Sequence, residues 1–207
     1  MFKIFKFDDE DKLYHIGRMD YSKKSRHSYE GDGLSVSICP EEWQGITPLG
    51  GNLWELRKED PKFLDVLSLT ENEKDIVTNW AVDNGFVTKG YAYKYPVFVE
   101  DDEYVGMSYT FEEAVNEYCQ DEEYPEEDII KIDALIATDK LINQTYTDID
   151  ITLVFDTILA LYVETVLDYD GLYWDELLDV YRLSAPRGVV FNSKINTFKA
   201  ALIDDNF

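Results

Sequence analysis

Histidine and cysteine are scarce in this chain, which has two residues of each among 207. Zinc sites and histidine-based catalytic triads draw on these side chains, so we expect no metal site and no such triad. The sequence also contains no Walker loop and no GxGxxG, HExxH or GxSxG motif. These absences argue against the common nucleotide-binding, metalloprotease and hydrolase classes.

Long apolar runs are absent as well. No stretch approaches about 18 consecutive apolar residues, so we expect no membrane span. The first residues, MFKIFKFDDED, show no apolar region typical of a secretion signal. Cys39 and Cys119 fit a reducing compartment. These observations predict a cytoplasmic protein.

Basic residues are scarce in one part of the chain. Residues 100–187 hold 4 Lys and Arg against 24 Asp and Glu, whereas residues 1–99 hold 13 against 17. The net charge of −24 is therefore concentrated in one segment. Such a field repels nucleic acid and attracts basic protein surfaces. Two interpretations stay open: the charge only keeps the protein soluble, or it imitates DNA and occupies a DNA-binding partner.

Hydrophobic residues make up 45% of the chain and aromatic residues 14%, which is enough for a packed core. Capping-box patterns at Thr70–Glu73 and Thr110–Glu113 predict helix starts, and an apolar run predicts a buried helix over 149–166. Pro40 is expected to begin one helical turn. Apolar alternation and turn residues predict strands at 2–7, 12–16, 34–38, 52–58, 172–174 and 188–191, and a hairpin from 90–100 and 103–109.

These elements predict a single α+β domain over 1–207 with short strands at both ends of the chain. Its mixed core is expected to come from 1–58 and 146–207, interrupted by an acidic α/β insertion at about 59–145.

A basic cluster stands out in this acidic chain. Five cationic or titratable side chains lie within ten positions, directly after Tyr14-His15, and small residues follow them. They are Arg18, Lys23, Lys24, Arg26 and His27. The cluster is either a solvated loop or the binding site of a negatively charged ligand, where Arg forks onto phosphate oxygens.

Four sequence pieces, in order, resemble motifs of the ADP-ribosyltransferase superfamily in its bacterial and phage branches. Leu13-Tyr14-His15-Ile16-Gly17 is similar to a strand motif of the type Tyr-His-Gly, and Gly33-Leu34-Ser35-Val36-Ser37 to a later Gly-apolar-aromatic-apolar-Ser strand. GNLWELRK is similar to the strand after it. Residues 169–176, YDGLYWDE, are similar to the final region that supplies a carboxylate.

The resemblance implies a mixed ADP-ribosyltransferase-like core and a site for NAD or ADP-ribose. In such a site His15 would hold a ribose hydroxyl, and the backbone near Ile16 and Gly17 would bind the nicotinamide amide. Asp175 or Glu176 would be the acidic residue that stabilises positive charge growing on the ribose. The other residues implied in ligand binding are Tyr14, Arg18, Arg26, Ser35 and Ser37.

Two positions depart from the family pattern. Ile16 stands where Tyr-His-Gly has its glycine, and Ser35 stands where an aromatic residue lines the pocket. Both changes favour a member that binds without catalysis. Two functions therefore remain: a phage counter-defence protein that neutralises a host DNA-directed defence system, such as a DarT-type toxin that ADP-ribosylates DNA, and an active mono-ADP-ribosyltransferase that modifies a host protein. The first predicts a basic host protein as partner, a site in the host cytoplasm, and no direct contact with nucleic acid or membrane.

Overall fold

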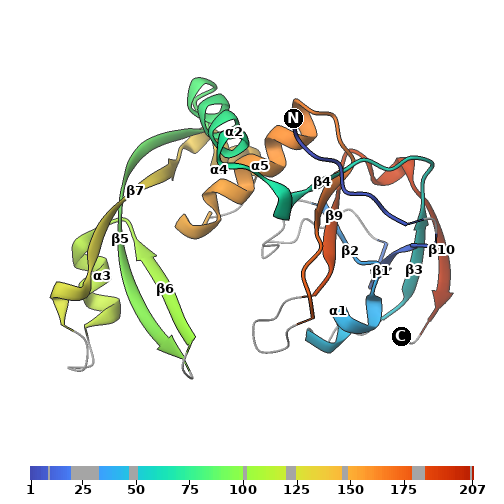
Figure 1. Cartoon of the computed structure of the whole chain (residues 1–207), viewed down its shortest axis with the longest axis horizontal. Coiled ribbons are helices and arrows are strands. Elements are labelled where there is room, and N and C mark those ends of the chain that lie inside the picture. Colours follow the sequence, from blue (N-terminus) through green and yellow to red (C-terminus); the bar gives the residue numbers. More distant parts are fainter. Residues whose placement is uncertain are drawn as a thin grey trace. The chain divides into compact units, whose positions relative to one another are not determined.

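The computed structural model of the chain describes residues 1–8, 10–19, 33–46, 51–99, 102–119, 125–145, 149–178, 185–205 and 207 (Figure 1). It contains both helices and sheets, which confirms the α+β class. The chain divides into two compact units, which we describe separately. Unit 1 comprises Met1–Val77 and Leu159–Phe207, and unit 2 comprises Thr78–Ile158. The insertion expected at 59–145 overlaps unit 2.

Unit 1 contains a four-stranded sheet in the order β2-β9-β8-β4. Its strands are β2 (Gly33–Val36), β9 (Arg187–Phe191), β8 (Gly171–Trp174) and β4 (Phe63–Asp65). β4 and β8 are parallel, and the other neighbours are antiparallel. The pair β4–β8 joins residues more than a hundred positions apart, so this sheet is built from both sequence halves of unit 1.

A three-stranded antiparallel sheet in the order β1-β3-β10 completes unit 1. Its strands are β1 (Leu13–Ile16), β3 (Leu53–Arg57) and β10 (Lys199–Asp204). Figure 1 shows β10 at the outer edge of the unit, next to β3. Tyr14 and Ser37 form an isolated antiparallel bridge, so β1 runs beside the end of β2.

Aromatic side chains fill the centre of unit 1. Phe63 and Tyr173 are fully buried, and the Phe5 ring stacks on Tyr173 with 4.3 Å between centroids. Residues 2–7 were expected to form an edge strand, but they form only a bridge at Ile4 to β4. Phe5 and Phe7 turn onto the core instead, and this anchors the segment by ring packing rather than by a regular ladder.

The predicted helices are confirmed. α1 (Pro40–Ile46) begins at Pro40, and α5 (Val154–Thr165) follows a short 3₁₀ turn, η3 (Ile151–Leu153). α2 (Glu71–Asp83) begins with reciprocal bonds between Thr70 and Glu73. α2 and α5 each span the division between the units. Unit 1 also has two short 3₁₀ turns, η1 (Val66–Ser68) and η4 (Ile195–Thr197).

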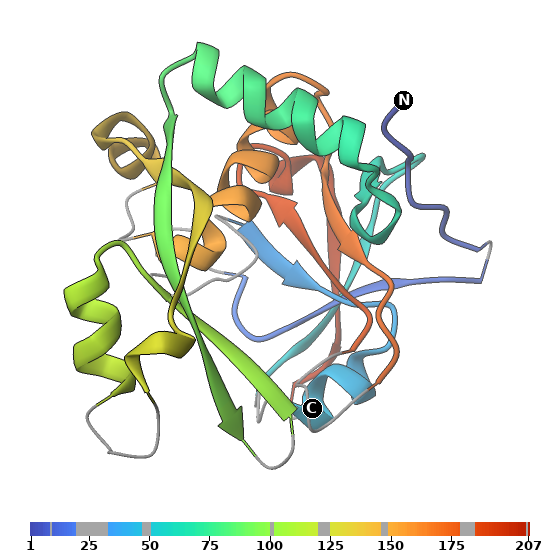
Figure 2. The same cartoon turned by 60° about the vertical axis from the view of Figure 1, so that its left-hand side comes forward.

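Unit 2 is built on an antiparallel sheet in the order β6-β5-β7. Its elements are β5 (Val87–Val99), β6 (Asp102–Ser108), α3 (Phe111–Tyr118), η2 (Glu126–Asp128), β7 (Ile130–Ala137) and α4 (Asp139–Thr145). In Figure 2, α3 lies beside the β5–β6 hairpin. The predicted capping box at Thr110 is present and begins α3. Across the described ranges, no helix has the length and apolar character that a bilayer crossing requires.

Candidate functional site

β1 and β2 bring together four of the residues that sequence analysis singles out. Tyr14 and Ser37 exchange two backbone hydrogen bonds, Tyr14 N to Ser37 O at 2.8 Å and Ser37 N to Tyr14 O at 2.9 Å. His15 follows on β1, and its Nδ1 lies 2.8 Å from the carbonyl oxygen of Ser35. We call this group, with Gly17 at the end of β1, the His15 site.

The two nitrogens of the His15 imidazole differ in their hydrogen bonding. A carbonyl oxygen can only accept, so Nδ1 carries the proton in the neutral ring and Nε2 offers a lone pair. The residue is 9% exposed, and among the described residues Nε2 has no hydrogen-bond partner of good geometry. Burial lowers the pKa of His15, and the carbonyls of Ser35 and Arg18 only partly oppose this. The ring is therefore neutral, and its Nε2 is a buried acceptor without a partner among the described residues.

Two glycines with positive φ angles approach each other at the end of β1. Gly17 has φ +130°, and a Cβ there would lie 3.4 Å from Nε2 of His15. Gly51 has φ +146°, and a Cβ there would lie 3.3 Å from the Gly17 Cα. The Trp54 indole holds this close approach by donating to the Gly17 carbonyl at 3.0 Å. Both backbone conformations favour glycine, because other residues adopt them only with strain.

Asp175 and Glu176 directly follow β8. Asp175 is exposed, and Glu176 forms an ion pair with Arg187, as the shortage of basic residues there leads one to expect. The Arg187 guanidinium also lies over the Trp174 ring, 5.7 Å from its centroid. The charge of Glu176 is therefore largely neutralised by a neighbouring cation.

Asp175 and Glu176 lie near the end of β2. The Ser37 hydroxyl donates to the Pro186 carbonyl, and the Ile38 amide donates to the Tyr173 hydroxyl at 3.2 Å. Burial raises the pKa of the Cys39 thiol, and four carboxylates, Asp175 among them, raise it further. Asp175 is thus close enough to Cys39 to affect its ionisation.

Strand register separates the carboxylates from the end of β1. Trp174 pairs with Arg187, which places the end of β8 level with Ser37 and Tyr14. From that level β1 runs one way to Gly17, whereas β8 continues the other way to Glu176. β1 therefore ends two residues, or ~7 Å along the strands, beyond the level at which β8 ends. The structure thus gathers Tyr14, His15, Ser35 and Ser37, and it places Asp175 and Glu176 away from Gly17 and Arg18.

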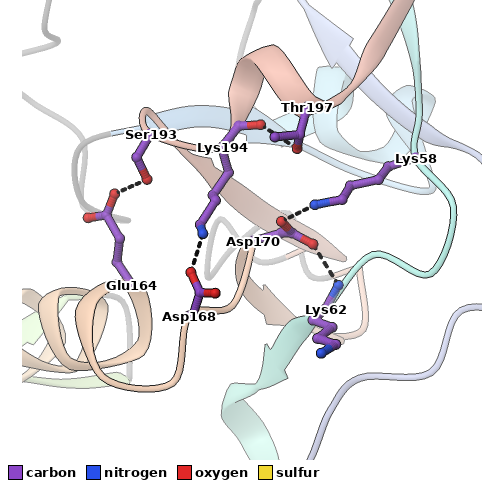
Figure 3. Close-up of polar contacts among 8 residues, drawn as sticks. All are labelled: Lys58, Lys62, Glu164, Asp168, Asp170, Ser193, Lys194 and Thr197. Atoms are coloured by element: carbon purple, nitrogen blue, oxygen red, sulfur yellow. Dashed lines mark hydrogen bonds and ion pairs between the residues drawn. The ribbon is translucent and has the colours of Figure 1, made fainter.

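A polar cluster that the sequence motifs do not predict lies around the turn that leads from α5 to β8 (Figure 3). Asp170, 5% exposed, accepts from Lys58 Nζ at 2.5 Å and from the Lys62 amide at 2.9 Å. Lys194 forms an ion pair with Asp168, which lowers the pKa of that carboxyl. Lys58 and Lys62 come from one sequence half of unit 1 and the two aspartates from the other, so the cluster joins the halves. The scarcity of lysine in this region was the signal that could have suggested such pairing.

Arg26 lies outside the described residues, and so do its neighbours in the basic cluster, Lys23, Lys24 and His27. Three carboxylates of the acidic segment, Asp121, Glu122 and Glu123, lie outside them as well. Within the described ranges, no three His, Cys, Asp or Glu side chains come together as metal ligands do.

Unit 2 carries most of the charge, with nineteen Asp and Glu against four Lys. Six exposed carboxylates occur on α3 and η2, and we call them the acidic surface. They are Glu112, Glu113, Glu117, Glu126, Glu127 and Asp128. Within the described ranges, none of the six forms an ion pair with a lysine or arginine.

The acidic surface rests on a common hydrophobic cluster. Tyr95 of β5, Ala114 of α3 and Ile129 after η2 are buried together. The Tyr95 hydroxyl donates to Glu117 at 2.5 Å, and burial together with this carboxylate raises the pKa of Tyr95 to about 12. Glu126 and Asp128 raise the pKa of Cys119 at the end of α3, secondary to burial, so the two elements lie close together. The packing holds these carboxylates in one region.

Searches of protein-family models, of curated proteins and of solved structures find no match to this chain.

Proposed function

We propose that the protein is a phage counter-defence protein that binds and inhibits a basic, DNA-directed enzyme of the host, such as a DarT-type toxin. The observation that carries this proposal is the acidic surface of unit 2. Six carboxylates without cationic partners in the described structure concentrate negative potential on one packed corner. A DNA-binding enzyme presents the complementary positive potential. The size and acidic character of the chain are also similar to the anti-DarT factor of T-even-type phages.

Unit 1 supports an ADP-ribosyltransferase-like fold within this proposal. The pieces that resemble the superfamily occupy β1, β2, β3 and β8, and β1 lies between β2 and β3 through the Tyr14–Ser37 bridge and the β1–β3 ladder. His15 Nε2, a buried acceptor without a partner among the described residues, is the atom that would take the role implied by the resemblance, which is to hold a ribose hydroxyl. NAD or ADP-ribose would therefore bind at the His15 site, with Tyr14, Ser35 and Ser37 as neighbours.

Two features favour binding over group transfer. Glu176 is paired with Arg187. The positive charge of the guanidinium cancels much of the negative potential that would stabilise a positively charged ribose. The register also carries Asp175 and Glu176 away from Gly17. An active mono-ADP-ribosyltransferase is the second candidate, and the observation in its favour is the buried Nε2 of His15, which has no partner among the described residues.

The decisive experiment measures ADP-ribosylation of single-stranded DNA by a purified DarT-type toxin, with and without this protein. We expect stoichiometric inhibition by the wild type. The variant Glu112→Lys/Glu113→Lys/Glu126→Lys/Glu127→Lys should lose inhibition, because its surface no longer resembles a polyanion. A matched control, Asp8→Lys/Glu10→Lys/Glu41→Lys/Glu59→Lys, makes the same change in net charge at other positions and should still inhibit.

Glu176→Gln separates the two candidates. An inhibitor that acts by binding should tolerate this change, whereas a transferase should lose all activity. Loss of function in Glu176→Gln, with full function in the fourfold charge reversal, would overturn the proposed function in favour of the transferase. Calorimetric titration with NAD and ADP-ribose, repeated on His15→Ala, then tests the ligand site by itself, and heat that is equal in wild type and variant would remove His15 from it.

A further inference from the structure

The last strand of unit 1 presents an open edge. β10 ends the sheet β1-β3-β10, so only one of its two edges is paired within the described structure. All six residues of β10 are exposed, including Leu202 at 49% and Ile203 at 52%. An exposed edge with apolar side chains is a ready template for pairing with another strand. The sequence of β10 indicates which strand can pair with this open edge.

The sequence of β10, KAALID, is complementary to itself. It carries a cation at one end, Lys199, and an anion at the other, Asp204, with four uncharged residues between them. Antiparallel pairing of two identical strands brings opposite ends together, so each Lys199 approaches an Asp204. Directly opposite charges across strands are favourable, and like charges are unfavourable.

The register makes this pairing possible. Symmetric antiparallel strands pair residues whose side chains point to the same face, so a regular six-residue strand could not place its first residue opposite its last. β10 has an irregularity in its pairing with β3: Leu202 lies opposite Trp54 and Asp204 opposite Leu53, which leaves Ile203 as an extra residue. This bulge shifts the alternation by one residue.

With a two-fold axis at Ala201, every residue of β10 except the bulged Ile203 has a partner in the second copy. Ala201 lies opposite the Ala201 of a second copy, and Ala200 lies opposite the second copy's Leu202, a small side chain against a large one. At each end of the strand pair, Lys199 of one copy lies opposite Asp204 of the other. A carboxylate has two oxygens and accepts several donors, so Asp204 can take this contact in addition to others.

From these observations we propose that β10 pairs with the β10 of a second copy, forming a symmetric dimer with a continuous six-stranded sheet. The occupant is a second copy of this chain because the charges, the side-chain sizes and the bulge all match the strand itself. One strand pair is a small interface, so the dimer is weak and depends on concentration. Each copy carries −24, so added salt strengthens the dimer by screening repulsion. Salt has the opposite effect on binding of a basic partner, which keeps this inference separate from the proposed function.

Sedimentation equilibrium over a concentration series tests the dimer. The wild type should shift from 24.1 kDa toward twice that mass, more so at high salt. Lys199→Asp and Asp204→Lys each place like charges opposite one another, and each should weaken association roughly tenfold. The double variant Lys199→Asp/Asp204→Lys restores opposite pairs and should recover it. Lys6→Asp, which makes the same change in net charge as Lys199→Asp at another exposed site, should leave association unchanged.

A monomeric mass at every concentration and salt would overturn the proposal, as would equal weakening in the double variant and the singles. The register has its own test, with Cys39 and Cys119 first replaced by serine. Ala201→Cys places the new thiols opposite each other across the two-fold axis, so mild oxidation should give a covalent dimer. Ala200→Cys should form much less of it, and equal cross-linking of the two variants would refute the register.

Discussion

The ion pair between Lys58 and Asp170 is the contact whose loss should weaken unit 1 most clearly. The Asp170 side chain is 7% exposed and that of Lys58 is 24% exposed. Removing one partner of a buried pair costs ~3–5 kcal/mol, and a hydrogen bond to a charged group contributes ~1.5–3 kcal/mol. Because water still reaches Lys58, we expect Asp170→Asn to lower the free energy of unfolding by ~2–3 kcal/mol.

A double-mutant cycle isolates the pair from the other contacts of Asp170. Urea unfolding of wild type, Asp170→Asn, Lys58→Met and the double variant should give a coupling free energy of ~1–2 kcal/mol. The Lys74–Glu71 pair provides the matched control, because both side chains are largely exposed. Lys74→Met should cost less than ~0.5 kcal/mol. Coupling of Lys58 with Asp170 below ~0.3 kcal/mol, the usual error of additivity, would refute the reasoning.

Three further changes test other parts of the structure. In Gly171→Ala the new Cβ would lie 1.8 Å from the Val189 carbonyl oxygen, so unit 1 should lose ~3 kcal/mol or more in a urea titration, whereas Gly45→Ala, with open space around it, should not destabilise. Between pH 7 and 5 the unfolded chain protonates His15 but the buried ring resists, so stability should fall by up to ~1.4 kcal/mol per pH unit. This contribution should be missing in His15→Gln. Equal dependence of stability on pH in wild type and variant would contradict the burial of His15. Thr110→Ala removes the cap of α3 and should raise hydrogen exchange there by an amount equivalent to ~1 kcal/mol, with Thr110→Ser close to wild type.

Local signals in the sequence predicted most elements of the fold. The capping boxes at Thr70 and Thr110 marked helix starts because the motif satisfies backbone donors within four residues. β7 was missed although Ile130, Ile132 and Ile136 alternate with other residues in IKIDALIA, because acidic surroundings obscured the pattern. β4 and β10 were missed because neither carries the simple alternation that marks a half-buried strand. β4 is buried at all three positions, and β10 is exposed at all six.

The candidate site was less predictable because it depends on register. The sequence indicated Tyr14, His15, Ser35 and Ser37, and their strands do meet. It gave no measure of how far along β8 the carboxylates lie, because that depends on pairing with a strand more than ten residues later. It also gave no indication that Gly51 approaches Gly17 or that Trp54 holds the Gly17 carbonyl, since both contacts join separate strand ends.

The parallel pairing of β4 with β8 sets the order in which the two units can form during synthesis. Phe63 cannot form its strand pair until Gly171, its partner, has left the ribosome. Unit 2 uses contacts between nearer residues, such as the β5–β6 hairpin, and is complete in sequence well before that point. Domains fold as they emerge, and non-local strand pairing is slow. A nascent chain should therefore carry a folded, strongly acidic unit 2 while the first half of unit 1 still exposes its apolar strands, and the negative charge of unit 2 would then help keep that intermediate from aggregating.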